Sequence, residues 1–177
     1  MRNMGTIGDD VKITAGVKIL THGYDWSVLS NVYDEMLGSS GKVTIGDNVF
    51  IGVNTTILKG VKVGDNVIIG ANSLVNKDLA PNGVYAGYPI LYITSVENYY
   101  NKRKTEYAEE AKELAISYVE RFGKKPPMSL FHEFVPLFLE RTDENKPLND
   151  QYLAGRPNVK EKFYQTQPQF SGFESFF

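Results

Sequence analysis

Several kinds of residue are absent or scarce in this sequence of 177 residues. It has no cysteine, which excludes a disulfide scaffold and thiolate chemistry, and its two histidines are too few for three histidine ligands on one metal ion. The net charge is -2, so no basic field favours nucleic acid or an anionic membrane surface. No segment approaches membrane-spanning length, and residues 1–5 lack the apolar core of a signal peptide. We therefore expect a cytoplasmic protein that binds no metal.

What the sequence does contain is a repeat of six residues. Between residues 45 and 79, aliphatic or small side chains recur with gaps that alternate between two and four positions. A gap of two is a short β-strand whose alternate side chains point inward. The gaps of four hold triplets such as Gly46-Asp47-Asn48, whose glycine and asparagine accept the left-handed backbone of a corner. The expected inward residues are Ile45, Val49, Ile51, Thr55, Ile57, Val61, Val63, Val67, Ile69, Ser73, Val75 and Leu79.

Short strands joined by equal corners wind into a coil, and coils must stack because one coil cannot bury its inner face. The pattern also runs through Ile7, Val11, Ile13, Val17 and Ile19. It stops at His22 and resumes at Ile45, so we expect that about twenty residues leave the coil as an extruded loop, residues 23–42.

The hexad pattern and the segment VYAGYPI at residues 84–90 resemble the hexapeptide-repeat acyltransferases, in particular those that O-acetylate sugars and polysaccharides. The resemblance implies a mainly β fold, a left-handed parallel β-helix with three sides and about three coils of eighteen residues. We assign residues 1–93 to this β-helix, with loop 23–42, and residues 94–177 to C-terminal helices and an aromatic-rich tail. The resemblance also implies acetyl-CoA as acyl donor and a homotrimer with sites between subunits. From the net charge and the absence of a membrane-spanning segment, we expect neither nucleic-acid binding nor membrane insertion.

His22 is the candidate catalytic base. An acceptor hydroxyl is a poor nucleophile near neutral pH, and a neutral imidazole is well matched to remove its proton. From the residues alone, His22 could equally be a solvent-facing histidine of a turn. The resemblance implies that His22 is the general base and that the backbone N–H of Val53 stabilises the oxyanion of the attacked thioester.

The resemblance also suggests residues that bind acetyl-CoA. It implies a contact of the pantetheine arm with Ala71 and a place for Asn76 and Lys77 near the cofactor. Phe50 lies between two inward residues, so we expect its side chain to face outward. The resemblance implies that it lies near the site between subunits. Relatives carry a basic residue after the closing segment, whereas this chain has Ile90-Leu91-Tyr92, so one partner of the cofactor phosphates is missing.

The loop that follows His22 is the candidate acceptor site. Trp26 can stack on a sugar ring, and Asp25 or Glu35 can orient the imidazole or bind the acceptor, although each is also an ordinary residue for a solvated loop. The pair Glu35-Met36 resembles a Glu-Met pair in sugar acetyltransferase loops. We therefore expect acetyl transfer to a hydroxyl of a sugar or surface-polysaccharide precursor. The alternatives are a non-catalytic trimeric scaffold and a non-sugar acceptor such as serine, an amino sugar or an antibiotic.

The C-terminal part carries helical signals. Residues 96–122 have an apolar stripe of helical period and are followed by Gly123, a typical helix end. We expect a second helix over residues 130–140, capped by Ser129 and bent by Pro136. The Phe-rich end, residues 162–177, is expected to dock on a groove or on a neighbouring subunit.

Overall fold

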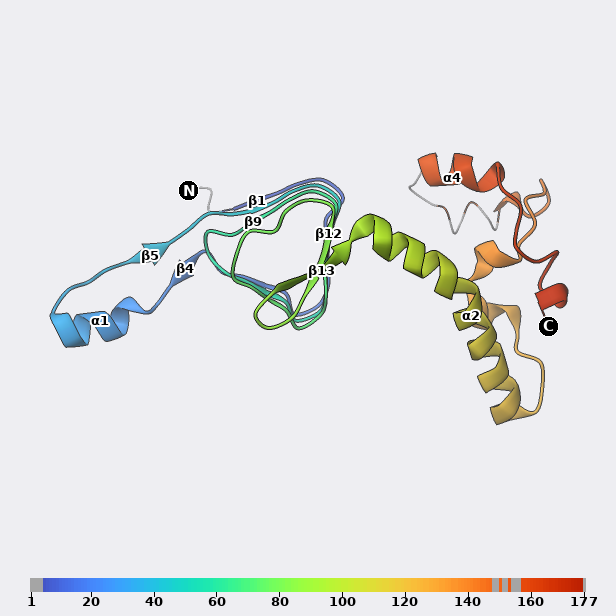
Figure 1. Cartoon of the computed structure of the whole chain (residues 1–177), viewed down its shortest axis with the longest axis horizontal. Helices are drawn as coiled ribbons and strands as arrows, with labels where there is room; N and C mark the ends of the chain where they lie inside the picture. Colours follow the sequence, from blue (N-terminus) through green and yellow to red (C-terminus); the bar gives the residue numbers. More distant parts are fainter. Residues whose placement is uncertain (1–4, 148–149, 151–152, 154–156, 177) are drawn as a thin grey trace. The chain divides into compact units, whose positions relative to one another are not determined.

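The structure is a computed structural model that describes residues 5–147, 150, 153 and 157–176 (Figure 1). The chain divides into two compact units, Met1–Lys102 and Arg103–Phe177. Among the described residues, no helix has both the length and the apolar character that crossing a membrane requires.

The first unit is mainly β, and its chain visits parallel sheets in a fixed rotation. Sheet A contains β1 (Gly5–Ile7), β6 (Val43–Ile45) and β9 (Lys62–Val63). Sheet B contains β2 (Lys12–Ile13), β7 (Val49–Ile51), β10 (Val67–Ile69) and β12 (Gly83–Ala86), with β13 (Leu91–Ser95) added antiparallel at its end. Sheet C contains β3 (Lys18–Ile19), β8 (Thr56–Ile57) and β11 (Leu74–Val75). One coil is therefore one passage through A, B and C.

The register of these sheets confirms the predicted stacking. Ile51 pairs with Ile69 and Ile57 pairs with Val75, so one coil is eighteen residues. In the first coil, Ile7 pairs with Ile45, which is 38 residues away. The difference of twenty residues is the extruded loop that the sequence predicts.

The core of the first unit is the column of inward side chains. All twelve residues predicted to point inward between 45 and 79 are buried, with exposed fractions of 3% or less. The first coil differs, because Ile7 is 53% exposed and Ile13 is 47% exposed although they stand in register with Ile45 and Ile51. Within the described residues, no further coil stacks on these two side chains. Burial of an inward side chain therefore depends on cover from the next coil or, at the other end, from the segment that contains Ile90.

The corners have the predicted left-handed backbone. Asn48, Asn54, Asn66 and Asn72 all have φ between 54° and 59°. The side-chain amide of Asn48 donates to Oδ1 of Asn66 over 2.8 Å, and that of Asn66 donates to Asn82 over 2.9 Å. These bonds tie each coil to the next along the corner.

The extruded loop is a two-stranded ladder that carries one helix. β4 (His22–Gly23) pairs antiparallel with β5 (Ser39–Ser40), with His22 opposite Ser40. Helix α1 (Trp26–Tyr33) follows β4 and buries none of its residues. Figure 1 shows the ladder leading α1 away from the coils.

The second unit contains most of α2 (Val96–Phe122), whose limits agree with the prediction, and Gly123 follows it with φ 62°. Further elements are η1 (Met128–Phe131), η2 (Val135–Leu137), α4 (Pro157–Tyr164) and η3 (Glu174–Phe176). Its core joins Ala108, Ala111 and Ala115 of α2 to Phe131 and Phe138.

The predicted second helix over residues 130–140 is wrong. This segment forms the short 3-10 helices η1 and η2, and Pro127, not Ser129, precedes the first of them without a side-chain cap. Leu137, Phe138 and Leu139 are all buried in succession, and η2 ends at Leu137. Three successive residues of an α-helix would instead spread over more than half of its circumference. Burial of consecutive apolar side chains outweighs regular backbone geometry here.

The Phe-rich end packs within its own unit. The rings of Phe173 and Phe131 lie 5.4 Å apart, and those of Phe170 and Phe176 lie 5.0 Å apart. The tail therefore completes the aromatic core of the second unit, as far as residue 176; Phe177 lies outside the described residues.

Candidate active site

The predicted site residues lie at two different corners of the coils. His22 follows β3 of sheet C and precedes β6 of sheet A, and Asn76 and Lys77 stand at the same corner, between β11 and Leu79. Val53 and Ala71 lie at the corner between sheets B and C. Within one chain, His22 and the backbone of Val53 therefore lie at opposite ends of the strands of sheet C.

The corner of Val53 and Ala71 presents unused hydrogen-bond donors. Both residues are exposed, and their backbone N–H groups donate to no acceptor among the described residues. The carbonyl of Val53 accepts a bond from the N–H of Asn72 over 2.7 Å, which fixes the orientation of the peptide. A Cβ on Gly52 would lie 2.5 Å from the nitrogen of Ala71, so glycine is required where the two coils stack this closely.

The corner between sheets A and B explains why the N–H of Val53 is open. There the N–H of Asp47 donates to Oδ1 of Asp65, one coil later, over 2.8 Å, and the N–H of Asp9 donates to Oδ1 of Asp47 over 2.7 Å. Val53 and Ala71 occupy the same place in their triplets as Asp47 and Asp65, but have no side-chain oxygen. An aliphatic residue at this place therefore leaves the N–H of the coil below open to a ligand.

His22 is exposed on β4, and Oγ1 of Thr21 lies 3.4 Å from its Nδ1. Neither Asp25 nor Glu35 bonds to the imidazole within the described part of the chain. Thr21 is therefore the neighbour placed to orient the ring, a role for which sequence reasoning considered only carboxylates.

The predicted acceptor residues lie on the loop beyond His22. Asp25 is the N-cap residue of α1 and makes no side-chain cap bond, and Trp26 is the first residue of that helix. The rings of Trp26 and Tyr24 are 5.0 Å apart. Glu35 is exposed beyond the end of α1. The loop thus has an aromatic pair, Tyr24 and Trp26, next to the carboxylate of Asp25, in the segment that directly follows His22.

Sequence reasoning missed Lys59, which ties the base of the loop to the coils. Its Nζ donates to Oγ of Ser39 on β5, and Ser39 pairs with Gly23 on β4, the residue after His22. The sequence contained a signal for this contact: the corner triplet Leu58-Lys59-Gly60 has a long, positively charged side chain where Gly46-Asp47-Asn48 has an aspartate. Lys59 is half-buried, so its bond is shielded from competing water.

Replacing Lys59 with methionine is expected to loosen the loop without unfolding the coils, because the change removes one hydrogen bond and keeps the aliphatic stem. We expect faster limited proteolysis within residues 23–42 and an unchanged melting temperature to within a few degrees. The matched control is Lys62→Met, since Lys62 is an exposed lysine of β9. Equal cleavage rates in both variants would contradict the role of Lys59.

Phe50 faces outward, as predicted. It is 42% exposed between the buried Val49 and Ile51. Its register partners on sheet B are Lys12 in the coil below and Ile68 in the coil above. Together, Phe50 and Ile68 form an apolar stripe on the outer face of sheet B.

The fold and these corners define a protein of stacked six-residue repeats with an open backbone donor site. Residues 42–77 match the family model described as bacterial transferase hexapeptide (six repeats). The repeat within residues 42–77 is therefore similar to that of the bacterial hexapeptide transferases.

Individual relatives cover part of the chain. It is 48% identical over 96 residues to protein CapG of Staphylococcus aureus, which is 54% of this chain and 55% of CapG. It is 47% identical over 58 residues to UDP-3-O-acylglucosamine N-acyltransferase of Rickettsia conorii, which is 33% of this chain and 16% of that protein. A structure of galactoside acetyltransferase in complex with coenzyme A is similar at 40% identity and a TM-score of 0.45, over 52% of this chain and 45% of the other. The chain spans about half the length of CapG.

The described residues contain no group of three or more histidine, cysteine, aspartate or glutamate side chains placed to hold a metal ion.

Proposed function

We propose that this protein transfers an acetyl group from acetyl-CoA to a hydroxyl of a sugar or surface-polysaccharide precursor. The observation that carries the proposal is the pair of open N–H groups at Val53 and Ala71, one coil apart on a repeat that matches a transferase family model. Successive coils are spaced by about 4.8 Å, so two donors lie in a row along the corner. Such a row suits the carbonyl oxygens of a thioester and its pantetheine arm.

We further propose that the coils are left-handed, about three in number, and that the protein is a homotrimer. The separation of His22 from Val53 by sheet C supports a site made by two chains, with His22 from one and Val53 from its neighbour. The apolar stripe of the exposed Phe50 and the half-buried Ile68 is a suitable surface for the neighbour. A site between subunits explains why a single chain does not bring His22 and Val53 together.

In this arrangement, His22 acts as general base. With Nδ1 near Oγ1 of Thr21, Nε2 is the nitrogen left for the acceptor. Nε2 takes the proton of the acceptor hydroxyl while its oxygen attacks the thioester carbon, and the N–H of Val53 donates to the oxyanion that forms. The carbon–sulfur bond then breaks, the acetyl group stays on the acceptor oxygen, and the departing thiolate takes the proton from the imidazolium.

The acceptor would bind against the loop. The aromatic pair of Tyr24 and Trp26 offers an apolar face to a sugar ring, and Asp25 and Glu35 offer acceptors to its hydroxyl groups. An amine of an amino sugar is the second candidate, because one relative is named as an N-acyltransferase of an acylglucosamine. Location in the cytoplasm remains a prediction from the sequence.

The test is a screen for release of coenzyme A from acetyl-CoA with simple sugars, amino sugars, serine and chloramphenicol as acceptors. We expect turnover with a saccharide hydroxyl and a product that carries an acetyl ester. Turnover confined to amines would favour the second candidate. If millimolar acetyl-CoA does not bind at all, the protein is a scaffold and the proposal fails.

Lys77→Ala is expected to raise KM for acetyl-CoA about fivefold and to leave kcat nearly unchanged. Lys77 is exposed at the corner above His22, and one exposed ionic contact contributes about 1 kcal/mol at most. The effect should shrink as salt is raised. A fall in kcat with unchanged KM would remove Lys77 from the cofactor site.

A further inference from the structure

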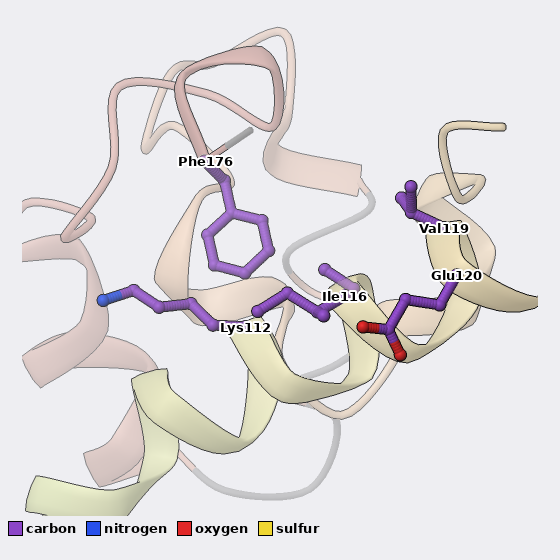
Figure 2. A pocket seen from close by; sticks show the side chains of 6 residues that line it. Lys112, Ile116, Val119, Glu120 and Phe176 are labelled. Atoms are coloured by element: carbon purple, nitrogen blue, oxygen red, sulfur yellow. The ribbon is translucent and has the colours of Figure 1, made fainter. Parts of the chain in front are cut away.

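A groove on the outer face of α2 has no assigned role. It has a volume of about 340 Å³ and is lined by Lys112, Ala115, Ile116, Val119, Glu120 and Phe176. Ile116 is 58% exposed and Val119 is 43% exposed, so apolar side chains are left in water along this face. Figure 2 shows Lys112 and Glu120 on opposite sides of Ile116, with the ring of Phe176 over the groove.

The charges at the two ends of the groove are placed symmetrically. Lys112 is four residues before Ile116, and Glu120 is four residues after it, so all three share one face of the helix. A second α2 that ran antiparallel, with its own Ile116 opposite, would bring its Glu120 to Lys112 and its Lys112 to Glu120. A parallel approach would instead place lysine against lysine and glutamate against glutamate.

We propose that this groove is an interface between two copies of the chain, in which two α2 helices pair antiparallel about a two-fold axis through Ile116. Such an interface is isologous, because each contact occurs twice. Lys112 already bonds to Glu109 over 2.9 Å, but an ammonium has three donors and can bind a second carboxylate. The pairing buries Ile116 and Val119, which single chains leave exposed.

The pairing concerns the second unit and does not rest on the proposed function. One helix pair buries less than the roughly 1,000 Å² typical of stable interfaces, so association should depend on protein concentration. If the chains are trimers, pairing through α2 joins two trimers.

Charge reversal tests the proposal with the full chain. Light scattering and sedimentation over a hundredfold range of concentration should show that the mass of the wild-type protein doubles. Lys112→Glu and Glu120→Lys should each lose this doubling, because each places like charges opposite one another. The double variant should regain it, and an equimolar mixture of the two single variants should associate although neither does so alone.

Two further variants support the interpretation. Ile116→Ser should lose the doubling without a charge change, whereas Lys124→Glu, a reversal outside the groove, should keep it. Circular dichroism should show equal helix content in all variants, since every changed side chain is exposed. The proposal is overturned if wild-type mass does not change with concentration, or if neither the double variant nor the mixture restores association. Acetyl-CoA turnover is measured separately, so its loss would bear on the proposed function alone.

Discussion

Ala71→Asp is expected to lower acetyl transfer by about 10²- to 10³-fold while leaving the fold intact. The reason is the contrast between two corners of the same coil. At the corner between sheets A and B, the carboxylate of Asp65 accepts the N–H of Asp47, eighteen residues earlier. Ala71 stands eighteen residues after Val53, so an aspartate there should accept the N–H of Val53. Removal of one oxyanion donor typically costs about 10²- to 10³-fold in rate.

Three controls separate this blockage from other effects of the substitution. Ala71→Asn supplies an acceptor oxygen without a charge and should lose activity similarly, whereas Ala71→Ser should retain more because its side chain is shorter. Asp65→Ala opens the N–H of Asp47 at the other corner and should not change turnover. The melting temperature of Ala71→Asp should equal or exceed that of the wild-type protein. A variant Ala71→Asp with near wild-type kcat would remove Val53 from the site.

The repeat could be predicted from the sequence because the physics of each hexad is local. A strand with two inward side chains and a corner with asparagine at positive φ are each encoded within six residues, and stacking repeats them. The sequence therefore predicted correctly which individual side chains are buried, including the polar residues Thr55 and Ser73. Thr55 Oγ1 and Ser73 Oγ both donate to the carbonyl of Gly70, which satisfies these buried hydroxyls.

The second unit was less predictable because its core depends on contacts distant in sequence. α2 was predictable from its periodicity and from Gly123, both local signals. The segment 130–140 was not, since its backbone conformation depends on the aromatic rings of Phe173 and Phe176, which pack on Phe131 and Phe138 from the far end of the chain. Apolar composition alone could not distinguish an α-helix from consecutive 3-10 turns.

The candidate site shows a similar division. The positions of Val53, Ala71 and Phe50 followed from the repeat, but the open N–H groups required knowledge of which corners carry a capping carboxylate on the next coil. The contact of Lys59 with Ser39 joins a corner to the extruded loop, for which the sequence has no period. That His22 and Val53 lie at different corners could be seen only once the strands were assigned to sheets, because all corners look equivalent in the hexad pattern.

His22→Ala is expected to lower kcat by about 10²- to 10⁴-fold, the usual contribution of a general base. His22 is exposed and bonded only weakly to Thr21, so the substitution should change neither stability nor binding of acetyl-CoA. His132→Ala is the matched control, since His132 is also exposed but lies in the second unit, and it should keep full activity. If His22→Ala retains kcat within a few-fold of wild type, another group acts as base.

Mixing two inactive variants tests whether His22 acts across a subunit boundary. His22→Ala lacks the base but keeps the corner of Val53, whereas Ala71→Asp keeps the base but blocks that corner. In a trimer assembled from both, one site combines His22 of the Ala71→Asp chain with Val53 of the His22→Ala chain and is intact. Random assembly of equal amounts should therefore restore about a quarter of wild-type activity, because every mixed trimer has one such site. A co-refolded mixture that stays as inactive as its components would show that His22 and Val53 do not form a shared site between neighbouring chains.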